Sequence, residues 1–177
     1  IKQKKKKNDL CIYFYIQKKK KDIYIYNLIN QGSYNKIYTF SKDKNSSMDS
    51  NLIMRISDPN NPVEIINSEL KGIKIQHKLC SVCNNIGIVV DYGCLYNKNK
   101  DYKIQEFSII GKYGNSLTDF LKLKHKPKYS SFKVMVKFIY DLLKTINCIH
   151  VNNYAHLDLK SCNILLDKDL DINNNKK

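Results

Sequence analysis

Residues 156–167 read His-Leu-Asp-Leu-Lys-Ser-Cys-Asn-Ile-Leu-Leu-Asp, and this stretch decides the fold. It places Asp158, Lys160 and Asn163 close together in the chain and ends in an apolar run. Residues 131–152, just before it, carry apolar side chains at helical spacing. These are Val134, Phe138, Leu142, Ile146 and Ile149. We therefore expect a loop between a long amphipathic helix and a short strand. A connection that carries Asp, Lys and Asn by chance is the structural alternative.

The loop closely resembles the catalytic loop of protein kinases, in which His-Arg-Asp-Leu-Lys is followed after two residues by Asn and an apolar strand. Phosphoryl transfer needs a carboxylate near the attacking hydroxyl, a cation on the moving phosphate and a metal ligand. By resemblance, Asp158 accepts the proton of the substrate hydroxyl, and Lys160 neutralises the γ-phosphate. Asn163 binds Mg²⁺, and His156 is structural. The position of Lys160 indicates a serine/threonine kinase rather than a tyrosine kinase.

Two further positions refine the resemblance. Leu157 stands where the family commonly has an Arg that pairs with a phosphorylated activation loop, so regulation by that route is not expected. Residues 114–117, Gly-Asn-Ser-Leu, resemble casein-kinase-1-like and related viral kinases.

Residues 29–37 resemble the kinase glycine-rich loop, whose backbone amides cover the ATP phosphates. The matching positions are Ile29, Gly32, Tyr34 and Ile37. Asn30 and Asn35 replace the two outer glycines. Asn tolerates a positive φ better than most residues, but its side chain limits how closely phosphate approaches. A plain hairpin turn centred on Gly32 is the alternative.

Residues 52–55, Leu-Ile-Met-Arg, align with the family's Val-Ala-Ile-Lys, whose lysine holds the α- and β-phosphates. Arg55 keeps the charge but replaces a compact ammonium with a planar fork, so phosphate geometry is expected to suffer. The resemblance implies a helix partner for Arg55, with Glu69 preferred and Glu64 as runner-up. A surface ion pair is the alternative.

The resemblance also implies an adenine site and two cofactors. Ile110 corresponds to the gatekeeper, and the backbone of Lys112 and Tyr113 to the hinge that meets adenine. ATP and Mg²⁺ are the implied cofactors, and a protein hydroxyl is the implied substrate.

Alternating apolar residues predict five strands and one helix before the catalytic loop. The strands are expected at residues 23–29, 37–40, 52–56, 86–92 and 106–110. Asn61 is expected to cap the helix, with Pro62 at its first position and Glu64 answering back to the cap. The expected fold is α+β and two-lobed, with a five-stranded antiparallel small lobe and a partial helical large lobe. The expected domains are a basic extension (1–21), the small lobe (22–112) and the partial large lobe (113–177).

The chain is strongly basic, with 31 Lys and Arg against 16 Asp and Glu. Such an excess raises the question of nucleic acid or anionic membrane. Lysines gather at residues 2–7 and 18–21, around one apolar run, and are otherwise scattered. This distribution favours a solvated, compositionally biased surface over a nucleic-acid interface.

Composition also bears on the compartment. The apolar run at residues 10–16 is far shorter than the roughly 20 residues that span a bilayer, and no signal peptide is evident. Six cysteines at irregular positions favour reduced thiols over a disulfide framework. We therefore expect no membrane span and an intracellular, cytoplasmic protein.

No Asp-Phe-Gly and no Ala-Pro-Glu occurs in the sequence, so it is expected to be a kinase domain truncated after the catalytic loop. By itself it should transfer phosphate poorly, because the first motif carries a principal Mg²⁺ ligand. A missing large-lobe segment or a partner is expected to cover apolar surface on the long helix. The sequence leaves three interpretations open: an incomplete active kinase, a catalytically dead pseudokinase that acts as a binding scaffold, and a basic nucleic-acid-associated protein.

Overall fold

The computed structural model describes residues 10–16, 19–41, 51–96, 104–122 and 132–166. The lysine cluster at residues 2–7 lies outside these ranges. The chain divides into two compact units. The strand-rich unit comprises residues 1–78 and 87–112, and the helical unit comprises residues 79–86 and 113–177.

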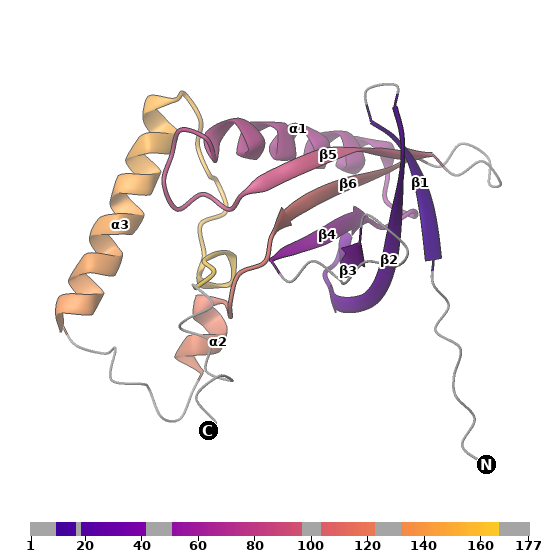
Figure 1. The fold of residues 1–177 in the computed structure, drawn as a ribbon. Coiled ribbons are helices and arrows are strands. Elements are labelled where there is room, and N and C mark those ends of the chain that lie inside the picture. Colours follow the sequence, from indigo (N-terminus) through magenta and orange to yellow (C-terminus); the bar gives the residue numbers. More distant parts are fainter. Residues whose placement is uncertain (1–9, 17–18, 42–50, 97–103, 123–131, 167–177) are drawn as a thin grey trace, which may run out of the picture. The chain divides into compact units, whose positions relative to one another are not determined.

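The strand-rich unit contains an antiparallel sheet (Figure 1). Its strands are β1 (Leu10–Ile16), β2 (Lys19–Gln31), β3 (Asn35–Ser41), β4 (Leu52–Ser57), β5 (Val89–Tyr96) and β6 (Ile104–Gly111). They lie in the order β1-β2-β3-β4-β6-β5, and pairing of Phe14 with Leu95 joins β1 to β5, so the sheet closes on itself. The five expected strands are β2 to β6, which confirms the α+β prediction. The apolar run before them adds β1.

Alternation along the strands builds one apolar core. Its buried members are Ile23, Ile25, Phe40, Met54, Ile56, Phe107 and Ile109. Gly93 on β5 faces the fully buried ring of Phe107 across the β5–β6 pair. A Cβ at Gly93 would lie 2.9 Å from Phe107 Cε1, so this close approach requires glycine.

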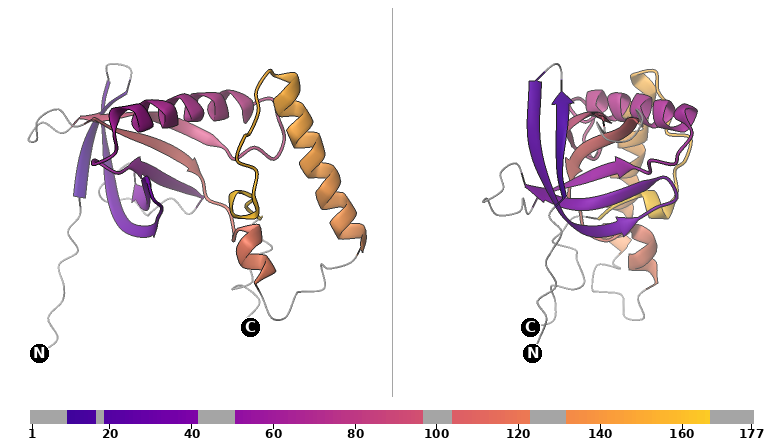
Figure 2. Two further views of the ribbon diagram at one scale, coloured as in Figure 1. Left: turned by 180° about the vertical axis from the view of Figure 1, so that it is seen from behind. Right: turned by 90° about the vertical axis from the view of Figure 1, so that its right-hand side faces the viewer.

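Helix α1 (Val63–Leu79) runs alongside β5 in the strand-rich unit (Figures 1 and 2). Gln76 Nε2 donates to the Gly87 carbonyl at 2.8 Å, and His77 Nδ1 lies 2.8 Å from the Val89 carbonyl oxygen. These bonds fix the last turns of α1 against the start of the strand.

The start of α1 differs from the expected capping box. The helix begins at Val63, one residue later than expected, and the Pro62 carbonyl accepts the amides of Ile65 and Ile66. The Asn61 side-chain amide donates to the Tyr34 carbonyl at 2.8 Å. Asn61 therefore ties the β2–β3 turn to the segment before α1.

The helical unit contains α2 (Leu117–Leu121), α3 (Phe132–Val151) and the short 3₁₀ helix η2 (Ser161–Asn163). Ser116 caps α2, because its Oγ accepts the Asp119 amide at 3.2 Å. Of the expected stripe on α3, Ile149 is buried, whereas Val134 is exposed. A second set of large apolar side chains on α3 is exposed: Phe132, Met135, Ile139, Tyr140 and Leu143.

Candidate functional site

Three polar side chains of the loop that follows α3 contact one another. Asp158 Oδ2 accepts hydrogen bonds from Lys160 Nζ at 2.9 Å and from Asn163 Nδ2 at 3.0 Å. Asn163 Nδ2 also donates to the Asp158 carbonyl at 2.9 Å. All three side chains are exposed. The structure thus brings together the residues that the sequence assigned to catalysis and to metal binding.

The backbone of the loop is sharply turned at Leu157. Its φ of 59° lies in the left-handed region, which is uncommon for a residue other than glycine, and its side chain is 94% exposed. The Asp158 amide donates to the His156 carbonyl at 2.8 Å and lies 3.3 Å from His156 Nδ1. His156 and Leu157 therefore set the direction in which the Asp158 carboxylate leaves the chain.

The far end of the loop is anchored inside the helical unit. The Leu117 amide donates to the Ile164 carbonyl at 2.8 Å, and the Gly114 amide donates to the Leu166 carbonyl at 2.9 Å. These bonds hold the chain on both sides of an isolated bridge that pairs Leu165 with the residue before α2. The polar cluster consequently lies on a loop whose far end is fixed to the segment before α2.

Electrostatics keep this cluster charged. The hydrogen bond from Lys160 holds the pKa of Asp158 below its ordinary value, and Asn163 acts in the same direction. The same contact raises the pKa of Lys160. At neutral pH the pair is therefore a carboxylate beside an ammonium, which is the form that phosphoryl transfer requires.

The donor set fits Mg²⁺ only in company with a nucleotide. Asn163 Nδ2 donates to Asp158, which leaves Asn163 Oδ1 with only the weak Cys162 thiol donor at 3.8 Å. No group of three or more His, Cys, Asp or Glu among the described residues could hold a metal. Mg²⁺ is commonly held by one or two protein groups together with waters and substrate phosphates. Asn163 Oδ1 fits one such protein ligand.

In the strand-rich unit, the Gly32 amide donates to the Asn35 carbonyl at 2.8 Å and closes the turn between β2 and β3. Gly32 does not have a positive φ, and a Cβ there would lie 3.7 Å from the Asn35 carbonyl oxygen, an ordinary contact. The turn itself does not require glycine. The neighbouring candidates Ile29 and Tyr34 are about half exposed, and Ile37 lies on β3 opposite Arg55 of β4.

Arg55 lies on β4, as expected, but its partner differs from the expected one. Its terminal nitrogen Nη2 lies 3.5 Å from Glu106 Oε1 on β6, two residues from Ser108, which is opposite Arg55 in the strand pair. Neither Glu69 nor Glu64 of α1 forms an ion pair with Arg55 among the described contacts. The prediction of an Arg55–Glu69 pair is therefore wrong.

Glu69 instead accepts a hydrogen bond of 2.7 Å from Asn35 Nδ2, which links α1 to the β2–β3 turn. The physical reason is competition. Glu106 reaches Arg55 from the neighbouring strand, whereas Asn35 offers Glu69 a neutral donor. The sequence reasoning missed Glu106, although it is the one charged residue in the expected strand at 106–110. An acid inside an apolar strand signals a buried polar contact.

The expected adenine site is positioned by the end of β6. Ile110 is half-buried on β6, opposite Ile53 of β4 and Val89 of β5. The Lys112 amide donates to the Asn51 carbonyl at 2.7 Å, so this N–H is already engaged within the strand-rich unit. Tyr113 is the first residue of the second segment of the helical unit.

The helical unit also contains a disulfide, which corrects the expectation of reduced cysteines. Cys83, in the loop after α1, is bonded to Cys148 of α3, across 65 residues of sequence. Cys80, Cys94 and Cys162 are not part of a disulfide. Spacing alone could not reveal the pair, because the fold brings the loop to the helix.

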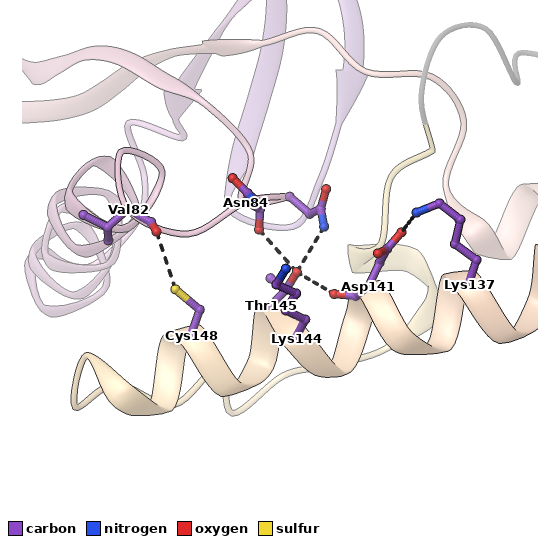
Figure 3. A pocket seen from close by; sticks show the side chains of 8 residues that line it. Val82, Asn84, Lys137, Asp141, Lys144, Thr145 and Cys148 are labelled. Carbon is purple, nitrogen blue, oxygen red and sulfur yellow. Dashed lines mark hydrogen bonds and ion pairs between the residues drawn. The ribbon is translucent and has the colours of Figure 1, made fainter.

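A polar cavity of about 490 Å³ lies beside this disulfide (Figure 3). Its lining residues are Val82, Asn84, Asn85, Lys137, Asp141, Lys144, Thr145 and Cys148. Thr145 Oγ1 lies within hydrogen-bonding distance of the Asn84 and Asp141 carbonyls, and Lys137 pairs with Asp141 at 2.6 Å. Much of the polar lining is thus already engaged in hydrogen bonds and an ion pair.

Among the described residues, no helix is long and apolar enough to cross a membrane.

The sheet, its single helix and the anchored polar loop define a protein-kinase-like α+β fold. Among solved structures, the chain is similar to the one named PpkA-294 in its apo form, with a TM-score of 0.62 and 13% sequence identity. The match covers 83% of this chain and 55% of that chain, so this chain spans about half the length of the protein it matches. No protein-family model matches the sequence. No curated protein matches it either.

Proposed function

We propose that the chain is part of an ATP-dependent serine/threonine protein kinase. The observation that carries the proposal is the exposed cluster in which Asp158 accepts from both Lys160 and Asn163 on one anchored loop. A carboxylate, a cation and an amide oxygen at this spacing are the groups that phosphoryl transfer uses.

In this proposal the ionised Asp158 accepts the proton of a serine or threonine hydroxyl. The hydroxyl oxygen forms a bond to the γ-phosphorus of ATP while the bond from that phosphorus to the bridging oxygen breaks, and ADP leaves. Lys160 offsets the negative charge of the phosphoryl group as it moves. Asn163 orients Asp158 through Nδ2, and its Oδ1 would bind Mg²⁺. The ion supplies charge neutralisation between the phosphates when it is bound.

In this proposal Gly32 and Arg55 contact the phosphates of the nucleotide, and Ile110, Lys112 and Tyr113 are assigned to its adenine. The proposal includes an intracellular, cytoplasmic location, where ATP is available. A disulfide such as Cys83–Cys148 is uncommon in a reducing compartment, so its redox state in solution bears directly on this part of the proposal.

A pseudokinase that binds partners is the second candidate, and one observation favours it. The residue at the phosphate-binding position is Arg55, and it is already paired with a buried carboxyl group. Such a pair lowers the positive charge available to phosphates.

Thermal unfolding of the chain with and without ATP and Mg²⁺ separates the two candidates. The kinase proposal expects ATP to raise the midpoint, Arg55→Ala to abolish the rise and Arg55→Lys to keep part of it. Asp158→Asn should keep the effect of ATP on the midpoint, and any phosphate transfer that the chain shows to a test protein should fall by about 100-fold or more. Asp141→Asn, in an ion pair on α3, is the matched control. Absence of any ATP effect would favour the scaffold.

A further inference from the structure

A cluster of buried polar groups lies where β4, β6, α1 and the β2–β3 turn meet in the strand-rich unit. Among the described residues, the buried side-chain atoms without a hydrogen-bond partner all belong to this cluster. They are Asn35 Oδ1, Arg55 Nε, Glu69 Oε2, Glu106 Oε2 and Ser108 Oγ. Buried polar atoms are usually satisfied, so a concentration of exceptions needs a physical explanation.

We propose that Glu106 is a positioning residue for Arg55, because it holds the guanidinium and sets the net charge that the phosphates of a nucleotide meet there. This inference rests on the proposed function, in which Arg55 contacts phosphate. It adds a residue that the resemblance to kinases did not assign.

The geometry fixes Glu106 and leaves Arg55 partly free. Glu106 has no exposed surface, and its amide donates to Ser57 Oγ at 2.8 Å. The Arg55 side chain is 26% exposed, and Nη2 is its one donor with a partner among the described contacts. A guanidinium has five N–H donors. Glu106 can therefore hold Nη2 of Arg55 while other N–H groups of the guanidinium stay available to a ligand.

A second carboxyl group adjoins the first. Glu69 acts electrostatically on Glu106, and each of the two acids has a buried carboxylate oxygen without a hydrogen-bond partner. Burial raises the pKa of Glu106 to about 7, with Glu69 acting in the same direction and Arg55 opposing.

The proton decides the charge of the cluster. With Glu106 protonated, Arg55 and Glu69 cancel; with Glu106 ionised, the three groups carry one net negative charge. From β5, Cys94 also faces Glu106, and its own pKa is raised, by burial first, so it stays a neutral thiol. The positive charge of Lys74 on α1 lowers the pKa of Cys94 and so opposes the effect of burial. Polyphosphate should consequently bind more weakly as the pH rises through neutrality.

The test measures ATP affinity of the full chain by calorimetry from pH 5.5 to 8.5 in wild type, Glu106→Gln and Glu64→Gln. Glu64→Gln is the matched control, because Glu64 is exposed in the first turn of α1. ATP itself titrates in this range, so the comparison is the ratio between proteins at each pH. We expect the wild-type affinity to fall about tenfold relative to Glu106→Gln, and Glu64→Gln to follow wild type.

Each outcome has one meaning. A constant ratio of wild type to Glu106→Gln across the range overturns the role of Glu106 while leaving ATP binding intact. No ATP binding by wild type, or equal binding by Arg55→Ala, overturns the proposed function instead. If Glu106→Gln does not fold, Glu69→Gln decides, because removal of the neighbouring acid should move the wild-type transition to lower pH. An unmoved transition overturns the inference.

Discussion

Asn35 Nδ2 donates a hydrogen bond of 2.7 Å to Glu69 Oε1, and this contact joins the β2–β3 turn to helix α1. In the kinase resemblance, the positions of these residues have other roles: Asn35 replaces a glycine of the phosphate-covering turn, and Glu69 is the expected partner of Arg55. An amide at the turn satisfies the helix acid, and the strand arginine pairs with Glu106 instead.

Asn35→Ala should destabilise the strand-rich unit by about 1–3 kcal/mol, because Glu69 Oε1 would lose its donor in a half-buried site. Asn30→Ala is the matched control. Asn30 is exposed, and its side chain accepts only the adjacent Gln31 amide among the described bonds, so its replacement should change stability by less than about 0.5 kcal/mol. Urea unfolding measures both. Equal losses of unfolding free energy in the two variants would show that the Asn35–Glu69 bond does not stabilise the unit.

Glu106→Gln should flatten the pH dependence of stability. In the folded chain the pKa of Glu106 is raised to about 7 from its ordinary 4.5, so the folded state binds the proton more tightly. The stability that this tighter proton binding contributes is fully present below pH 4.5 and is lost as the pH rises through 7. The slope between these values is at most about 1.4 kcal/mol per pH unit. Urea midpoints from pH 5 to 8 should fall in wild type and change less in Glu106→Gln; parallel curves would contradict the assignment.

The elements of this fold follow largely from local pattern. Alternation located β2 to β6, and apolar spacing located α3 to within a residue at each end. Strand β1 was harder to predict, because residues 10–16 lie between lysine clusters and a short apolar run has no distinctive period. Its partners, β2 and β5, become evident only in three dimensions.

The candidate site likewise contains contacts that the sequence could predict and contacts that it could not. Asp158, Lys160 and Asn163 are close in sequence, so a short loop is enough to bring them together. Arg55 and Glu106 are 51 residues apart, and their contact depends on the register between β4 and β6, which local pattern does not encode. The Cys83–Cys148 bond was missed because the two cysteines are 65 residues apart and meet only in the folded chain.

Two glycine substitutions should have opposite effects on stability. Gly93→Ala would place a Cβ 2.9 Å from the buried ring of Phe107, and the crowding should cost about 1–3 kcal/mol. Gly72→Ala on α1 meets no atom within 4 Å and should stabilise by about 0.5–1 kcal/mol, because alanine is the better helix former. Thermal or urea unfolding gives both values. Destabilisation by Gly72→Ala would indicate a tight contact on that face of α1.

Reduction of Cys83–Cys148 should lower stability by about 2–4 kcal/mol, since the bond closes a long loop in the unfolded chain. Dithiothreitol and Cys83→Ser should have similar effects, and Cys162→Ser, at an exposed free thiol, should have almost none. Mass spectrometry after alkylation counts the thiols that react. If both cysteines are alkylated without reductant, the pair is reduced in solution, as a reducing compartment would favour.

Gly32→Ala separates the two interpretations of the β2–β3 turn. Gly32 has no positive φ, and an added Cβ would make only an ordinary contact with the Asn35 carbonyl oxygen, at 3.7 Å. Folding should therefore be unchanged or slightly favoured, by up to about 1 kcal/mol. A backbone that covers phosphate is different, because the added methyl group would keep the ligand away from the turn amides. We expect ATP affinity to fall at least several-fold while the unfolding midpoint without ATP does not fall. Unchanged ATP affinity would show that the turn is a plain hairpin and that any phosphate contact lies with Arg55.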